Sequence, residues 1–184
     1  LLGLAHGLTA LVDFLTRLIR AGIEPGRAKG RLRTVTGFLM EQAIDHETYG
    51  SYFPYSSGNK IPAKKSRMAW CHGDPGTGAI LLNAARITGD RTLEISSLDI
   101  LANSAQRREP GENLVMDACL CHGTAGLARI FHRVYTGTGM EIFKETAGYW
   151  YEKTLEFASH TDGCGGFKSW CGENNYRNIL SLSG

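Results

Sequence analysis

The sequence has 184 residues, of which 42% are hydrophobic and 21% are charged, and its formal net charge is +2. An ordinary apolar content with a small net charge excludes an intrinsically disordered chain, and no apolar run is long enough to span a membrane. The weak charge also gives no support for a nucleic-acid partner. Glycine is unusually frequent, with 23 residues against 5 prolines, so we expect sharp turns and close backbone approaches.

Apolar residues recur at helical spacing along most of the chain, and no segment alternates convincingly at the period of a strand. We therefore predict an all-α fold. The predicted helices cover residues 8–19, 32–44, 79–86, 93–105, 127–134 and 142–159. Glycines mark helix boundaries, with Gly30 before the second helix and Gly137 and Gly139 after the fifth. The turn-rich segments 49–65 and 162–176 are predicted to be loops.

A short histidine-glycine loop precedes three of the predicted helices. The pairs are His6–Gly7, His72–Gly73 and His122–Gly123, and Leu180–Gly184 resembles the front half of a fourth copy. Each repeat would hold two helices and a long loop, which indicates a stack or ring of helical hairpins. We predict one such domain over residues 1–184. The sequence does not start with methionine and reads like part of a longer chain, so the presence of a signal peptide upstream is left open.

Two of the repeated loops carry potential metal ligands. Cys71, Cys121 and His122 occupy equivalent places, and equivalent loops of a ring of hairpins converge at one end. Two thiolates and one imidazole suit Zn²⁺, and three protein ligands leave the open position typical of a catalytic site. The alternative is that each cysteine is a small buried apolar residue. The odd count of 5 cysteines argues against a disulfide framework and favours a reducing compartment.

The strings Arg67–Gly76 and Cys121–Gly126 resemble the zinc-binding segments of lanthionine synthetase C-like proteins, and Ala5–Gly7 resembles the catalytic histidine loop of that family. The order and approximate spacing of the loops agree over the whole chain. The resemblance implies an α/α toroid, which in this family has seven helical hairpins. The present chain would be an incomplete part of it, the C-terminal half without the last hairpin.

The same resemblance implies a reaction. A cysteine thiol of a ribosomal precursor peptide adds to a dehydroalanine or dehydrobutyrine of that peptide, which forms the lanthionine rings of lantibiotics. His6 would protonate the α-carbon, Arg67 would stabilise the enolate oxygen or hold the peptide, and zinc would lower the pKa of the attacking thiol. His72 stands where a family member has tyrosine, and is either a second acid-base group or a hydrogen-bonding loop residue.

The implied partners are the dehydrated precursor peptide, a dehydratase and an exporter. The expected location is the cytoplasm, with membrane association only through those partners. A different class of function stays open, in which the zinc binds glutathione or another thiol for a regulatory or scaffold role. The catalytic aspartate of the family would lie upstream of residue 1, which leaves open whether this chain is active alone.

Several other polar residues have plainer interpretations. Three histidines are predicted to be surface or helix-capping residues: His46, His132 and His160. Cys119 is interpreted as a supporting or core thiol, and Asp74 and Asp117 as residues that cap helices or orient ligands. Trp170, beside Cys164 and Cys171, is interpreted as an aromatic packed in a turn, with a loop that covers the site as the alternative. The basic residues between 17 and 33 are interpreted as a solvated helix face, with an anionic ligand or acidic peptide as the alternative.

Overall fold

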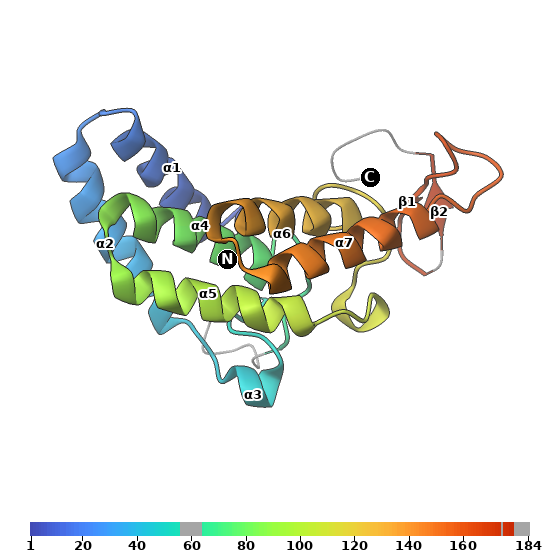
Figure 1. Ribbon diagram of the computed structural model, residues 1–184, viewed down its shortest axis with the longest axis horizontal. Helices are drawn as coiled ribbons and strands as arrows, with labels where there is room; N and C mark the ends of the chain where they lie inside the picture. Colours follow the sequence, from blue (N-terminus) through green and yellow to red (C-terminus); the bar gives the residue numbers. More distant parts are fainter. Residues whose placement is uncertain (56–63, 174, 179–184) are drawn as a thin grey trace. The chain divides into compact units, whose positions relative to one another are not determined.

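The computed structural model describes residues 1–55, 64–173 and 175–178, and helices dominate this part of the chain (Figure 1). The elements follow in the order α1 (Leu8–Arg20), α2 (Pro25–Glu41), α3 (His46–Tyr49), α4 (Asp74–Thr88), α5 (Arg91–Gln106), the short 3-10 helix η1 (Gly111–Asn113), α6 (Thr124–Thr138), α7 (Glu141–Glu156), β1 (Ser169–Trp170) and β2 (Tyr176–Arg177). The predicted all-α class is confirmed. The proposed fourth repeat, Leu180–Gly184, lies outside the described residues.

The chain divides into two compact units. The first consists of Leu1–Arg67 and Cys71–Ser104, and the second of Met68–Trp70 and Ala105–Gly184. The first unit therefore holds α1 to α4 and most of α5, while the second holds α6, α7 and the two short strands. Within the described ranges, none of the helices combines the length and the apolar character needed to cross a lipid bilayer.

In the first unit, α1 packs against both α2 and α4. The apolar stripe of α1 predicted from the sequence faces this core, because Val12 and Leu15 are buried there together with Leu32, Leu39 and Leu81. Burying a side chain of this size stabilises the fold by about 1.5–3 kcal/mol relative to leaving it exposed. These helices therefore fix the loops that precede α1 and α4.

The second helix begins earlier than predicted. Gly30 was interpreted as a boundary, yet α2 starts at Pro25 and contains both Gly26 and Gly30. Proline fits the first turn of a helix because the backbone N–H that it lacks has no partner there in any case. A Cβ at either glycine would meet no atom within 4 Å, so these glycines lie on an open face and do not end the helix.

In the second unit, α6 packs along α7. The rings of Phe131, on α6, and Phe143, on α7, are stacked with their centroids 6.2 Å apart, and Trp150 of α7 is fully buried. Of the two glycines predicted to close α6, Gly137 lies inside the helix, and the predicted end at Gly139 is confirmed. Gly139 has a φ of 69°, a left-handed conformation that glycine adopts without strain.

The segment 162–176 is not a simple loop. Ser169 pairs with Arg177 and Trp170 pairs with Tyr176, which makes a two-stranded antiparallel hairpin. Two-residue strands carry too few side chains to show an alternating pattern, so sequence periodicity could not reveal them. The hairpin belongs to the second unit.

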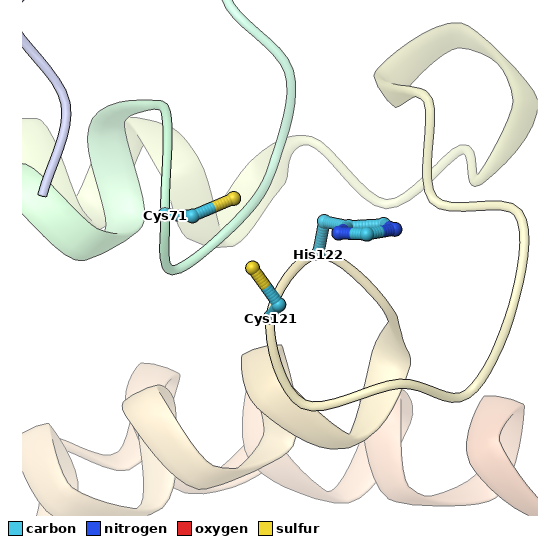
Figure 2. A group of neighbouring side chains, drawn as sticks. All are labelled: Cys71, Cys121 and His122. Carbon is cyan, nitrogen blue, oxygen red and sulfur yellow. The ribbon is translucent and has the colours of Figure 1, made fainter. Parts of the chain in front are cut away.

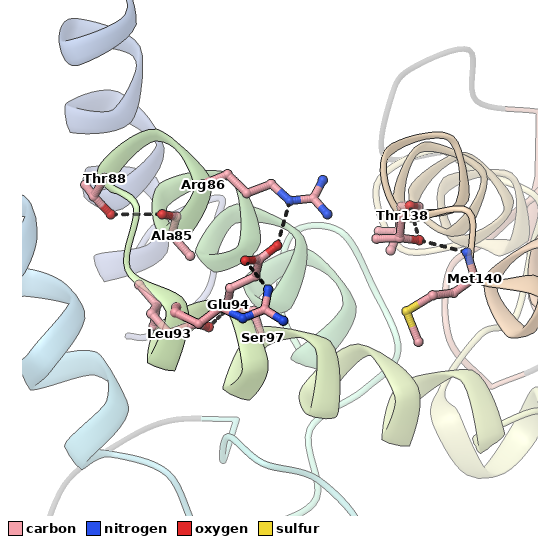
Figure 3. Close-up of polar contacts among 10 residues, drawn as sticks. Ala85, Arg86, Thr88, Leu93, Glu94, Ser97, Thr138 and Met140 are labelled. Atoms are coloured by element: carbon pink, nitrogen blue, oxygen red, sulfur yellow. Dashed lines mark hydrogen bonds and ion pairs between the residues drawn. The ribbon is translucent and has the colours of Figure 1, made fainter.

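Polar side chains connect α4 and α5 on the surface of the first unit. Arg86 Nε lies 3.2 Å from Glu94 Oε1, and Arg91 reaches the other carboxylate oxygen at 2.8 Å (Figure 3). Exposed ion pairs of this kind contribute at most about 1 kcal/mol. The core and the loops that it positions therefore matter more for the site than this surface network.

Candidate metal centre

The turn before α6 carries two of the predicted ligands. Cys121 and His122 are both half-buried, and the sulfur of one lies within 4.8 Å of a ring nitrogen of the other. The next residue must be glycine, because a Cβ on Gly123 would overlap the Cys119 nitrogen and lie 2.5 Å from the Asp117 carbonyl oxygen. The tight turn therefore presents a thiol and an imidazole side by side.

A buried carboxylate supports this turn. Asp117 accepts a hydrogen bond from the Cys119 N–H at 3.1 Å, and its carbonyl oxygen accepts one from the Thr124 N–H at 3.0 Å. Asp117, Cys119 and His122 form a second group whose potential ligand atoms lie within 4.8 Å of one another. Asp117 therefore holds the backbone on both sides of the turn that carries Cys121 and His122.

Cys119 lies under the same turn. The His122 N–H donates to its sulfur at 3.4 Å, and burial is the main cause that raises the pKa of the Cys119 thiol to about 12. A neutral, half-buried thiol that accepts a backbone hydrogen bond agrees with the interpretation of Cys119 as a supporting residue.

The turn before α4 carries the remaining predicted ligand. Cys71 is buried, and its carbonyl oxygen accepts a hydrogen bond from the Ala5 N–H at 3.1 Å. Figure 2 draws the three predicted ligands, with Cys71 on this turn and Cys121 and His122 on the turn before α6. Trp70, the residue directly before Cys71, belongs to the second unit, where its N–H donates to the Cys121 carbonyl oxygen at 3.0 Å.

The residues predicted to be catalytic gather in the first unit. The imidazole rings of His6 and His72 lie 6.3 Å apart between centroids, and His6 is exposed. Burial lowers the pKa of His72, and the nearby charges of His6 and Arg67 lower it further. The Nδ1 atom of His72 is buried and has no hydrogen-bond partner among the described residues.

Sequence reasoning missed one member of this cluster. The ring of Tyr55 lies 5.7 Å from that of His72 between centroids, and Tyr55 is 54% exposed. Tyr55 belongs to the segment 49–65, which was predicted only as a loop. No spacing rule connects a loop tyrosine to a histidine 17 positions away, so only the folded chain shows this pair.

The other histidines, cysteines and acidic residues singled out in the sequence have the following contacts in the structure. His46 stacks on Tyr52 at 4.2 Å, His160 contacts Tyr176 at 5.1 Å, and His132 is exposed on α6. Asp74 is fully buried and accepts hydrogen bonds from the N–H groups of Tyr52 and Phe53, at 2.8 and 3.0 Å. Cys164 and Cys171 are exposed free cysteines.

Comparison with known proteins now identifies the family. The sequence matches the model of the family described as lanthionine synthetase C-like protein over residues 1–179. The chain belongs to this family. The match extends over all three histidine-glycine loops, and the cysteine and histidine on the turn before α6 are residue types that could bind a metal.

Two relatives of this lanthionine synthetase C-like chain are informative. The solved structure named nisin cyclase superposes with a TM-score of 0.71 at 20% identity, over 84% of this chain and 40% of that chain. This likeness confirms the predicted α/α toroid class. The protein named glutathione S-transferase LANCL1, from Danio rerio, is 29% identical over 137 residues, which cover 72% of this chain and 30% of that protein. The chain therefore spans less than half the length of the relatives it matches.

Proposed function

We propose that this chain forms part of a zinc-dependent cyclase that closes lanthionine thioether rings in a dehydrated precursor peptide, as in lantibiotic biosynthesis. The observation that carries the proposal is the gathering of His6, Arg67 and His72 directly beside the turn of Cys71, in a chain of this family. The name of its structural neighbour, nisin cyclase, supports a cyclase-like role.

The donor set fits zinc. Cys71, Cys121 and His122 supply two thiols and one imidazole, which are the ligand types that zinc prefers. When bound, zinc would lower the pKa of a coordinated thiol, which makes that thiol a nucleophile at neutral pH.

The side chains of the first unit would manage charge and protons. In the addition, the peptide thiol loses its proton, a C–S bond forms at the β-carbon, and the C=C bond breaks as the α-carbon gains a proton. The exposed imidazole of His6 is the proposed donor of that last proton, since histidine exchanges protons near neutral pH. Arg67 would stabilise the developing enolate oxygen, and His72 would orient the peptide or His6.

The remaining proposals concern the setting of the reaction. The substrate would be a cytoplasmic precursor peptide that a dehydratase has already acted on, and the product would pass to an exporter. An enzymatic role for the chain without further segments is itself part of the proposal, because the chain spans less than half of its relatives.

Ring closure changes no mass, so it is measured by counting free thiols. The full chain, loaded with zinc, is incubated with a chemically dehydrated peptide that contains one cysteine. The free thiols of the peptide are then alkylated, and the alkylated fraction is measured by mass spectrometry. We expect the alkylated fraction to fall with time, and a chelator to prevent the fall. A peptide whose thiol stays fully alkylatable in the presence of the zinc-loaded chain would contradict the proposed activity.

A second candidate is favoured by the name of the relative LANCL1, glutathione S-transferase. The same site would then hold the thiol of glutathione and direct it to an electrophile, or keep it bound in a regulatory role. Adding glutathione to the assay separates the two candidates. A glutathione adduct on the dehydrated peptide, with no intramolecular ring, supports the second candidate over the first.

A further inference from the structure

We propose that Asp117 is a positioning residue for the metal ligands Cys121 and His122, and that the β1–β2 hairpin acts through it. The inference rests on the proposed metal site. It adds a role for the two short strands, residues 169–170 and 176–177, which the proposed chemistry does not use.

The carboxylate of Asp117 joins two distant parts of the second unit. Its Oδ1 atom accepts from the Cys119 N–H at 3.1 Å, and its Oδ2 atom accepts from the Trp170 N–H at 3.0 Å. Asp117 is only 1% exposed. Hydrogen bonds to a buried charged acceptor are stronger than hydrogen bonds between neutral groups, so this carboxylate holds both partners firmly.

The backbone of Asp117 closes the turn that holds the ligands. Its carbonyl oxygen accepts from the N–H of Thr124, the first residue of α6, at 3.0 Å. The Gly123 N–H donates to the Cys119 carbonyl oxygen at 3.1 Å. Cys121 and His122 therefore sit in a loop whose two ends are both tied to Asp117.

The hairpin makes a second attachment one residue upstream. The Tyr176 hydroxyl donates to the Met116 carbonyl oxygen at 3.2 Å. Tyr176 pairs with Trp170 across the hairpin. These two paired residues therefore bind the consecutive residues Met116 and Asp117. A single contact would let the hairpin pivot about it, whereas two contacts set its orientation.

The geometry favours a positioning role over direct ligation by Asp117. Both carboxylate oxygens already accept backbone hydrogen bonds, and turning one toward a metal would leave a backbone N–H without its partner, which is unfavourable. Asp74 provides a parallel beside the Cys71 turn, where a buried carboxylate also accepts two backbone N–H groups from a distant segment. Each ligand turn thus has its own buried carboxylate.

The test measures zinc affinity, by competition with a chelator, in the full chain and two variants. Asp117→Asn removes an acceptor, and Tyr176→Phe removes only the hydroxyl bond of the hairpin. Tyr149→Phe is the matched control, because the Tyr149 hydroxyl donates to the Arg108 carbonyl oxygen elsewhere in the second unit. We expect about 10- to 100-fold weaker zinc binding in Asp117→Asn, the range for residues that support metal ligands. Tyr176→Phe should be weakened a few-fold, and Tyr149→Phe should match wild type.

Two further readouts make the outcomes distinct. Circular dichroism of the metal-free variants checks the fold, and the visible spectrum of the Co²⁺-substituted chain reports ligand geometry, which a distant structural role would leave unchanged. Wild-type affinity in Asp117→Asn, or equal affinity in Tyr176→Phe and Tyr149→Phe, overturns the inference. If Asp117→Asn does not fold, the comparison of the two tyrosine variants decides. Failure of wild type itself to bind zinc would instead overturn the proposed metal site.

Discussion

The imidazole of His6 lies 6.3 Å from that of His72, between ring centroids, with the two planes inclined at 40°. The two histidines precede α1 and α4, and these two helices pack against each other. The histidine-glycine repeat therefore has a spatial meaning in the first unit, because packing of the helices brings the loops that precede them together. Residues separated by 66 positions become neighbours in this way.

His6→Asn should abolish ring closure without loss of zinc. Asparagine keeps the approximate size of the side chain but cannot exchange a proton, and a positioned acid or base contributes about 10²–10⁴ in rate. The measurement is the rate of thiol loss in the dehydrated peptide, alongside the zinc content of the variant. His132→Asn is the matched control, since His132 is exposed on α6 outside the cluster. Equal rates in the two variants would remove His6 from the mechanism.

Zinc should protect Cys121 from alkylation but leave Cys119 unprotected. The two thiols are both half-buried and only two positions apart, yet only Cys121 belongs to the proposed ligand set. Peptide mapping after alkylation, with and without zinc, measures the protection of each. The exposed Cys164 and Cys171 serve as internal controls. Protection of Cys119 in place of Cys121 would assign the metal to the group of Asp117, Cys119 and His122.

Gly3→Ala should destabilise the chain and disturb the catalytic cluster. A Cβ at Gly3 would overlap the Nδ1 atom of His72 and lie 2.5 Å from the Cys71 carbonyl oxygen, so the loop must shift. We expect a loss of about 1–3 kcal/mol in the free energy of unfolding, the usual cost of overpacking, and reduced ring closure. Urea unfolding provides the measurement.

Gly30→Ala is the control for that substitution. A Cβ at Gly30 meets no atom within 4 Å in α2, and alanine is a better helix former by about 1 kcal/mol. The variant should therefore unfold at higher urea concentration than wild type, with normal activity. Destabilisation at Gly30 equal to that at Gly3 would show that contact with the His72 loop is not the cause.

Sequence patterns predicted most of the helices and the histidine-glycine turns before them because the causes of these features are local. The apolar stripe that contains Val12 and Leu15 recurs at helical spacing, and the cysteines and histidines lie next to glycines that the tight turns require. The predicted start of the second helix after Gly30 is wrong, because the open surface around Gly30 tolerates glycine inside a helix that begins at Pro25.

The supporting contacts could not be predicted, because they join segments far apart in sequence. Asp117 and Trp170 are separated by 53 positions and meet through a backbone N–H, a group that every residue except proline carries. Tyr55 likewise approaches His72 from a loop without periodicity. Local residue types indicated the candidate ligands, whereas only tertiary packing shows which residues hold their turns in place.

Metal analysis of the purified chain tests the central claim most directly. We predict about one zinc ion per chain in wild type, as expected for a single site with three protein ligands. Cys71→Ala and Cys121→Ala should each lose most of that zinc, while Cys164→Ala, at an exposed cysteine outside the ligand set, should retain it. Full zinc retention in both Cys71→Ala and Cys121→Ala would contradict the proposed centre.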